Sequence, residues 1–237
     1  MKADAVPEMS IMARLRQETM PLHQETEKGH LSQDLVRGRL PVTRYAALLG
    51  QLYALHRHFE AALARAAASV AQLAKVARTY QLQEDQLVRD LLHLGRDLQG
   101  EAALPATREF NAFVDDLAAT SPVGLLGVLY VLEGSKNGGR FLAAAVRRAY
   151  GFERAGTEYL DPYGELQAER WKEFKTDMDS LDLSAEERDQ IVAAASSTFR
   201  HIMRIHQQLA QEDGEGTVPG NTAAHPGARN ATPDTGD

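Results

Sequence analysis

The amino-acid sequence predicts an all-α protein that folds as a single-domain helical bundle of about seven helices. From Ser10 onward, apolar residues recur at the spacing of helices that bury one face. Residues that begin and end helices separate these segments. No segment alternates apolar and polar residues as a half-buried strand does.

The first two predicted helices begin at polar residues. Ser10 is expected to cap a helix that extends to about His30, and Pro21 is expected to bend it. Thr43 begins the second helix, which carries a continuous apolar stripe. We expect this stripe to lie in the core; it consists of Tyr45, Leu48, Leu49, Leu52, Leu55, Phe59 and Leu63.

Two further helices are predicted in the middle of the chain. The first spans about residues 85–94 and ends at Gly95, a residue that commonly terminates helices. Pro105 begins the next one, because proline is well tolerated at the first helical position. Its apolar face consists of Phe110, Phe113, Val114 and Leu117.

The last three predicted helices lie between Ser121 and Gln211. Ser121 is expected to cap the first, which ends at Gly151. The second spans about residues 162–180 and starts at the Asp161-Pro162 pair. Residues 184–187 (SAEE) form a capping-box pattern at the start of the last helix.

The helical pattern fits one domain over residues 11–211. A chain of 237 residues can bury a full-sized core without dividing into two domains. Residues 1–10 are expected to be a flexible N-terminus. From residue 212 to residue 237 the sequence is rich in Gly, Pro, Thr, Asn and Ala, with almost no large apolar residue. This C-terminal tail is expected to be disordered, because burial cannot offset the entropy of ordering it.

Composition excludes several classes of function. With a net charge of -7 and scattered basic residues, the chain is not expected to bind nucleic acid. It has no cysteine, which excludes disulfides, iron–sulfur clusters and thiolate-bound heme. The longest apolar stretch, residues 123–132, is too short to span a membrane, and the N-terminal region does not resemble a signal peptide. We therefore expect a cytoplasmic protein with no membrane partner.

His23 is a candidate metal ligand. A neutral imidazole binds iron through one ring nitrogen, and an acceptor at the other nitrogen fixes its orientation. Glu27, one helical turn later, is placed to be that acceptor. The same pair also fits an ordinary solvated helix face.

Three glycines interrupt the helix that ends at Gly151, each costing about 1 kcal/mol relative to alanine. Gly134 and Gly138 share one face, with Gly139 beside it. The bare backbone suits contact with a flat ligand or close packing against another helix, and the spacing does not choose between them. A metal-binding histidine and a bare helix together suit a flat macrocycle, and the ligand they suggest is heme.

Two segments resemble helices of the biliverdin-producing heme oxygenases, bacterial-type branch. Residues 15–27 (LRQETMPLHQETE) are similar to the proximal helix of that family, and residues 130–139 (YVLEGSKNGG) are similar to its distal helix. The resemblance keeps the same order and spacing over residues 11–211. It implies a heme-oxygenase-like helical bundle.

The resemblance also assigns the two walls of a heme pocket. His23 would be the axial iron ligand, and Glu27 its nearby hydrogen-bonding partner. The distal wall, where the reaction would take place, would consist of Gly134, Ser135, Gly138 and Gly139. Ser135 stands where the animal-type enzymes have an aspartate that organises water, so the resemblance does not say which group replaces that carboxylate.

Three further residues match positions that contact heme propionates in the family. They are Arg16 on the proximal helix, Tyr130 on the distal helix and Lys175 in the penultimate helix. Met20 replaces a basic residue that some members carry one turn before the ligand. Lys175 alone also fits an exposed charge on an amphipathic helix.

The resemblance implies that heme is both cofactor and substrate. With O2 and an electron donor, such as a reductase or ferredoxin, the enzyme would open the macrocycle to biliverdin, carbon monoxide and ferrous iron. An alternative is a non-enzymatic heme-binding, storage or sensing protein on the same fold. A third, a carboxylate-bridged di-iron enzyme, needs Glu-x-x-His pairs that the sequence does not show.

Overall fold

The computed structural model of the protein describes residues 9–98 and 102–211. Within these ranges the chain is helical and contains no strand, which confirms the predicted all-α class. The described helices are α1 (Ile11–Lys28), α2 (His30–Val36), α3 (Val42–Ala67), α4 (Ala71–Val76), α5 (Glu84–His93), α6 (Pro105–Thr120), α7 (Leu125–Tyr150), α8 (Gln167–Asp179) and α9 (Ala185–Gln211). Three short 3-10 helices accompany them: η1 (Thr79–Gln81), η3 (Pro122–Gly124) and η4 (Gly164–Leu166).

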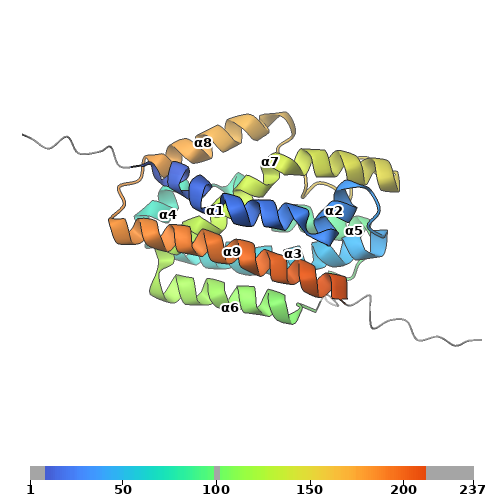
Figure 1. The fold of residues 1–237 in the computed structure, drawn as a ribbon, viewed down its shortest axis with the longest axis horizontal. Coiled ribbons are helices and arrows are strands. Elements are labelled where there is room, and N and C mark those ends of the chain that lie inside the picture. Colours follow the sequence, from blue (N-terminus) through green and yellow to red (C-terminus); the bar gives the residue numbers. More distant parts are fainter. Residues whose placement is uncertain (1–8, 99–101, 212–237) are drawn as a thin grey trace, which may run out of the picture.

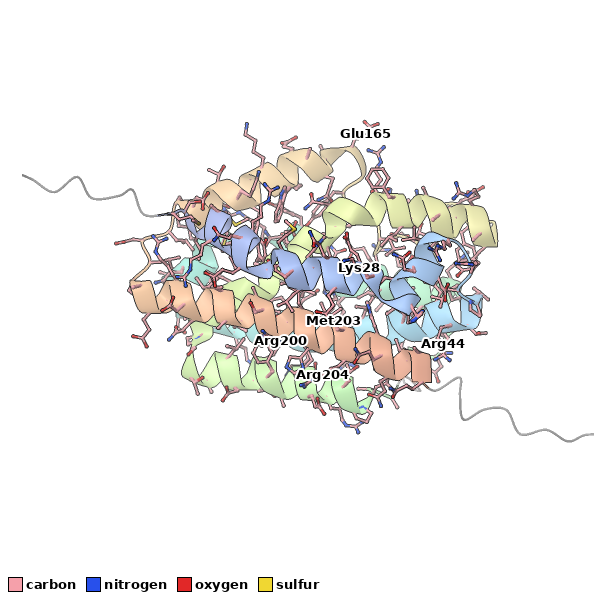
Figure 2. All side chains as sticks on the ribbon, in the orientation of Figure 1. Lys28, Arg44, Glu165, Arg200, Met203 and Arg204 are labelled. Carbon is pink, nitrogen blue, oxygen red and sulfur yellow. The ribbon has the colours of Figure 1, made fainter. Side chains whose placement is uncertain are left out.

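Helix α9 runs along most of the length of the bundle (Figure 1). It packs against α1, α6 and α7, and it also contacts α3. Helix α8 crosses the bundle at one edge, where it contacts both α1 and α7. Arg200 and Arg204, labelled in Figure 2, are exposed residues of α9, and Arg204 Nη1 lies 3.3 Å from Glu109 Oε2 of α6.

The bundle begins with a capped helix. The Ser10 hydroxyl accepts a hydrogen bond from the Ala13 amide at 3.3 Å, as predicted. Helix α1 runs without interruption through Pro21. It ends at Lys28 rather than at His30, because the chain turns at Gly29 and enters α2.

Local sequence signals correctly predicted the start of α9 and the C-terminal end of α7, but not the cap at the start of α7. The amide of Ser184 donates to Glu187 Oε2 at 2.8 Å, and the amide of Glu187 donates to Ser184 Oγ at 3.2 Å, which is the predicted capping box. Helix α7 ends at Gly151, whose φ is 72°. Ser121 makes no side-chain cap, because the 3-10 turn η3 precedes α7.

One further boundary and two short helices differ from the sequence prediction. Helix α8 starts at Gln167 instead of position 162, after an irregular segment and η4. Helices α2 and α4, of seven and six residues, were not predicted. They are short and depend on packing against the rest of the bundle for their stability.

The core lies between α3, α7 and α9. The stripe of α3 is buried as predicted, except that Leu52 is only partly buried. Helices α7 and α9 touch through backbone, because a Cβ at Gly127 would lie 2.1 Å from the carbonyl oxygen of Ile191. Sequence reasoning missed this glycine, which sets the distance between α7 and α9.

The predicted domain limits fall largely outside the described residues. Residues 1–8, 99–101 and 212–237 are not described, so the predicted flexible N-terminus and disordered tail lie almost wholly beyond the structure. Within the described ranges, none of the helices combines the length and apolar character needed to cross a membrane.

Candidate heme site

His23 lies on the exposed face of α1. Its side chain is 48% exposed, and its Nδ1 atom is 3.7 Å from Glu27 Oε2. The ring meets Phe199 of α9 edge-on, with 5.9 Å between the ring centroids and an interplanar angle of 80°. The aromatic contact restrains the imidazole from one side while leaving it accessible.

The exposed face of α1 extends for three turns. Arg16, Met20, His23 and Glu27 follow one another at intervals of four, three and four residues, and all four are exposed. Arg16 forms no ion pair within residues 9–98 and 102–211. The face therefore presents an available cation near one end and an available imidazole toward the other.

Gly134, Gly138 and Gly139 of α7 lie in three different environments. A Cβ at Gly138 would meet no atom within 4 Å, so this backbone borders open space. At Gly134 the nearest atom would be on the Trp171 ring, at an ordinary contact distance of 3.5 Å. At Gly139 a Cβ would lie 2.0 Å from the Leu160 carbonyl oxygen. Close packing therefore explains Gly139, whereas Gly138 leaves a bare, open surface.

Tyr130 connects the glycine helix to α1. Burial raises the pKa of the Tyr130 hydroxyl, and the Thr19 hydroxyl and the charge of Arg16 oppose this rise. Arg16 and Tyr130, both predicted to contact propionates, therefore interact electrostatically although they come from different helices. The Tyr130 ring also lies 6.1 Å from the Trp171 ring, measured between centroids.

Helix α8 closes one side of the same region. Trp171 is partly buried and stacks on Phe174 at a centroid distance of 5.4 Å and an interplanar angle of 17°. Lys175 is exposed one turn after Trp171 and therefore lies on the same face of α8. The structure thus places Lys175 on the helix that touches Gly134 and Tyr130.

The two exposed polar side chains between Gly134 and Gly138, Ser135 and Asn137, are neutral. The exposed Ser135 donates its hydroxyl hydrogen to the Leu132 carbonyl oxygen at 2.8 Å, within its own helix. The amide of Asn137 donates to the Gly134 carbonyl oxygen at 3.0 Å. No carboxylate lies on the exposed face of α7 that carries Ser135 and Gly138 within the described helix.

His56, considered from the sequence as a possible contributor of polar atoms, is a core residue. It is 2% exposed and sits 3.0 Å from Glu60 and 3.2 Å from the Tyr159 hydroxyl. Glu60 in turn accepts a hydrogen bond from the amide of Gln83. This chain of polar contacts ties α3 to the start of α5 and to the segment before α8.

Sequence reasoning missed a buried charged group on α7. Glu133 and Lys136 are 1% and 5% exposed, and Lys136 Nζ lies 2.7 Å from Glu133 Oε2. The sequence signal that could have identified them is two opposite charges three positions apart in a largely apolar helix.

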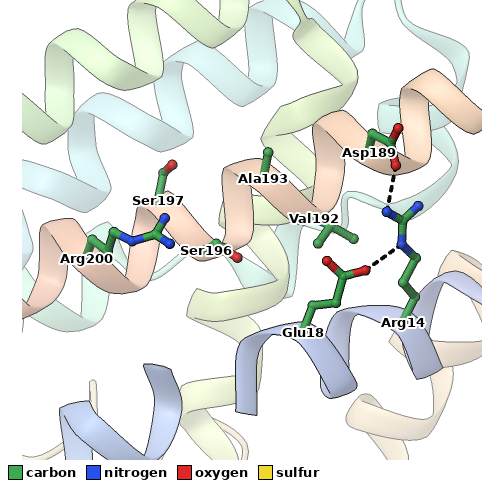
Figure 3. A pocket seen from close by; sticks show the side chains of 8 residues that line it. All are labelled: Arg14, Glu18, Asp189, Val192, Ala193, Ser196, Ser197 and Arg200. Atoms are coloured by element: carbon green, nitrogen blue, oxygen red, sulfur yellow. Dashed lines mark hydrogen bonds and ion pairs between the residues drawn. The ribbon is translucent and has the colours of Figure 1, made fainter. Parts of the chain in front are cut away.

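Two surface hollows lie elsewhere. Figure 3 shows the one between α1 and α9, where Arg14 pairs with Glu18 at 2.7 Å and with Asp189 at 2.6 Å. The other lies around Tyr53 and His58. Neither is lined by His23 or by a glycine of α7. The described residues also contain no group of three or more His, Asp or Glu that could hold a metal ion.

Comparison with known proteins relates the chain to one family. The family model described as heme oxygenase matches residues 9–208. A heme oxygenase from Xanthomonas campestris pv. campestris is 28% identical over 185 residues, which cover 77% of this chain and 98% of the relative.

Solved structures show the same fold. Heme oxygenase-1 from the cyanobacterium Synechocystis, solved in complex with heme, is 20% identical and has a TM-score of 0.80, covering 87% of this chain and 96% of that one. The heme oxygenase from Leptospira interrogans is 21% identical with a TM-score of 0.78, covering 84% and 100%. A Shewanella denitrificans domain of unknown function with a heme oxygenase-like fold has a TM-score of 0.71 at 15% identity, covering 87% and 94%. From the match over residues 9–208, this chain belongs to the heme oxygenase family.

Proposed function

We propose that this protein is a heme oxygenase, which binds heme through His23 and cleaves it to biliverdin, carbon monoxide and ferrous iron. The proposal rests on two exposed surfaces, one on α1 and one on α7, in a chain that belongs to this family. Helix α1 presents a half-exposed histidine, and α7 presents bare backbone next to open space at Gly138. The Synechocystis relative that shares the fold was solved with heme bound.

The residues of α1 fit the proximal side of a heme site. His23 is accessible enough to bind iron, and its contact with Phe199 limits rotation of the ring. Glu27 is close enough to receive the Nδ1–H proton in a hydrogen bond after a small shift of its side chain. The Nε2 atom would then carry the free electron pair that a metal needs.

The residues of α7 fit the distal side. Gly134, Ser135 and Gly138 are not covered by large side chains of their own, so a flat ring can approach the helix closely. Gly139 supports this wall from behind through its contact with Leu160. Ser135 and Asn137 add neutral polar atoms that can orient water beside the ring.

Arg16, Tyr130 and Lys175 fit the role of binding the two propionates. Arg16 has no ion-pair partner among residues 9–98 and 102–211, and its charge acts on the Tyr130 hydroxyl. A carboxylate bound by both would gain a charge-assisted hydrogen bond. Lys175 lies on α8 at the edge of the same region. Fixing both propionates fixes the rotation of the ring, and hence the meso edge that faces the distal wall.

When bound, heme supplies both the carbon that is oxidised and the iron that activates oxygen. The chain itself orients the ring, holds the ligand histidine in one tautomer and excludes bulky groups from the distal face. O2 is the oxidant, and a separate donor such as a reductase or ferredoxin supplies the electrons.

A second candidate is a heme-binding protein without turnover. Two observations favour it: Ser135 returns its hydrogen bond to its own helix, and a domain of unknown function shares the fold. Spectroscopic titration with heme, followed by addition of a reductant in air, distinguishes the two. Loss of the Soret band supports the oxygenase, and a persistent Soret band with several reductants supports the heme-binding protein.

A further inference from the structure

We propose that the buried cluster of Glu133, Lys136 and Tyr163 fixes the rotation of α7 about its own axis, so that Gly134 and Gly138 face the heme. The effect of this positioning on the reaction rests on the proposed function. The anchoring itself is a property of the heme-free chain and is tested separately.

Lys136, the central residue of the cluster, lies on the side of α7 opposite Gly134 and Gly138. Lys136 follows Gly134 by two residues, which places it about 200° around an α-helix. It is 5% exposed, whereas Gly138 is exposed and borders open space. A bond that holds Lys136 inward therefore holds the glycines outward.

Lys136 is fully engaged. Its ammonium group donates hydrogen bonds to Glu133 Oε2 at 2.7 Å, to the Tyr163 hydroxyl at 2.8 Å and to the Gln81 carbonyl oxygen at 2.9 Å. These use all three of its N–H groups. Two of the three partners belong to other parts of the chain, η1 and the segment before α8, so they connect α7 to its surroundings.

Glu133 and Tyr163 complete the cluster. The Tyr163 hydroxyl lies 3.2 Å from Glu133 Oε2, while Glu133 Oε1 has no hydrogen-bond partner among the described residues. Burial lowers the pKa of Lys136, and the Glu133 carboxylate opposes that change. The carboxylate depends on Lys136 for its stability in the interior, since a buried charge without a partner is costly.

The glycine segment needs such an anchor. Three glycines within six positions weaken the intrinsic helix preference of this stretch, and side chains cannot hold its open face. Gly139 packs against Leu160. This contact limits how closely the two segments approach, but it involves no side-chain hydrogen bond. On the exposed side, Gln167 of α8 donates a hydrogen bond to Asn137 Oδ1 at 3.1 Å. The directional bonds that hold this stretch from the interior are those of Lys136.

Hydrogen–deuterium exchange in the heme-free protein tests the anchor. The Lys136→Met variant keeps a long apolar side chain and removes the three hydrogen bonds. We expect the amides of residues 134–139 to exchange several-fold faster, with α9 unchanged. The Tyr163→Phe variant removes one bond and is expected to give a smaller change of the same kind. Arg148→Met, which removes an exposed charge from α7, serves as the control and is expected to exchange as the wild type does.

If Lys136→Met fails to fold, the double variant Glu133→Leu/Lys136→Met also removes the carboxylate that would be left without a partner, and it replaces both charged side chains by apolar ones. Unchanged exchange in residues 134–139, or a uniform increase across α7 and α9, would overturn the anchoring proposal. Neither result depends on heme.

The ratio of biliverdin isomers tests the consequence. A rotated glycine helix presents a different edge to the ring, so folded Lys136→Met should give a changed isomer ratio, while Arg148→Met should give the wild-type ratio. An unchanged ratio together with faster local exchange would overturn the positioning role. If the wild-type chain degrades no heme, the proposed function fails, and the exchange result still decides whether the cluster anchors the helix.

Discussion

The carbonyl oxygen of Leu160 lies directly against the backbone of Gly139, where a Cβ would come within 2.0 Å of it. One residue earlier, a Cβ at Gly138 would meet nothing within 4 Å. These neighbouring glycines of α7 thus serve different purposes: one permits packing of the chain on itself, and the other leaves a surface open.

The Gly139→Ala variant is expected to be less stable by about 3 kcal/mol, because the new methyl group collides with backbone that cannot move without displacing the chain before α8. Urea unfolding of the heme-free protein measures the change. A stability within error of the wild type would show that the contact with Leu160 is not required.

The Gly138→Ala variant is the matched control and a prediction in itself. Because its Cβ enters open space within a helix, the heme-free protein should gain about 1 kcal/mol in stability. Heme turnover should fall, since the methyl group stands on the wall that faces the ring. Full turnover in this variant would remove Gly138 from the proposed site.

Removal of the imidazole separates ligand binding from folding. His23→Ala is expected to change stability by no more than about 0.5 kcal/mol, because the side chain is half-exposed. The ferric heme spectrum should lose the signature of the histidine ligand, and added imidazole should restore it. His30→Ala, an exposed histidine of α2, is the control and should leave the spectrum unaltered.

Arg16 and Tyr130 should influence which edge of the ring is attacked as well as how tightly it binds. Arg16→Ala and Tyr130→Phe remove the two neighbouring groups assigned to a propionate. Each variant is expected to raise the share of a second biliverdin isomer, measured by chromatography after turnover. An isomer pattern identical to that of the wild type in both would refute their role in orientation.

Acid should destabilise the protein through His206. Burial lowers the pKa of this histidine from 6.5 to about 4, so the unfolded chain binds a proton at mildly acidic pH that the folded chain excludes. Stability is therefore retained above pH 6.5 and lost as the pH falls toward 4, by on the order of 2 kcal/mol at pH 5. Thermal unfolding at pH 7 and pH 5 should show a smaller loss in His206→Gln than in the wild type; equal losses would speak against this assignment.

The parts of the fold that the sequence predicted are those set by local interactions. The capping box of Ser184 and Glu187 and the glycine end of α7 each depend on a few neighbouring residues. The short helix α4 and the late start of α8 depend on what the rest of the bundle packs against them, which no local pattern encodes.

The candidate site divides in the same way. Helical spacing placed Gly134 and Gly138 on one face, but only the surroundings distinguish an open glycine from one pressed against Leu160. The link between Lys136 and Gln81 joins residues 55 positions apart and is invisible to spacing. Long-range partners therefore decide the roles that similar residues play.

Product identification after reductive turnover decides whether this protein is a heme oxygenase. The purified heme complex is supplied with O2 and an electron donor, and the products are separated by chromatography. We expect biliverdin, with carbon monoxide and ferrous iron released, and no biliverdin from His23→Ala. Recovery of intact heme from the wild-type complex with several electron donors would contradict this expectation.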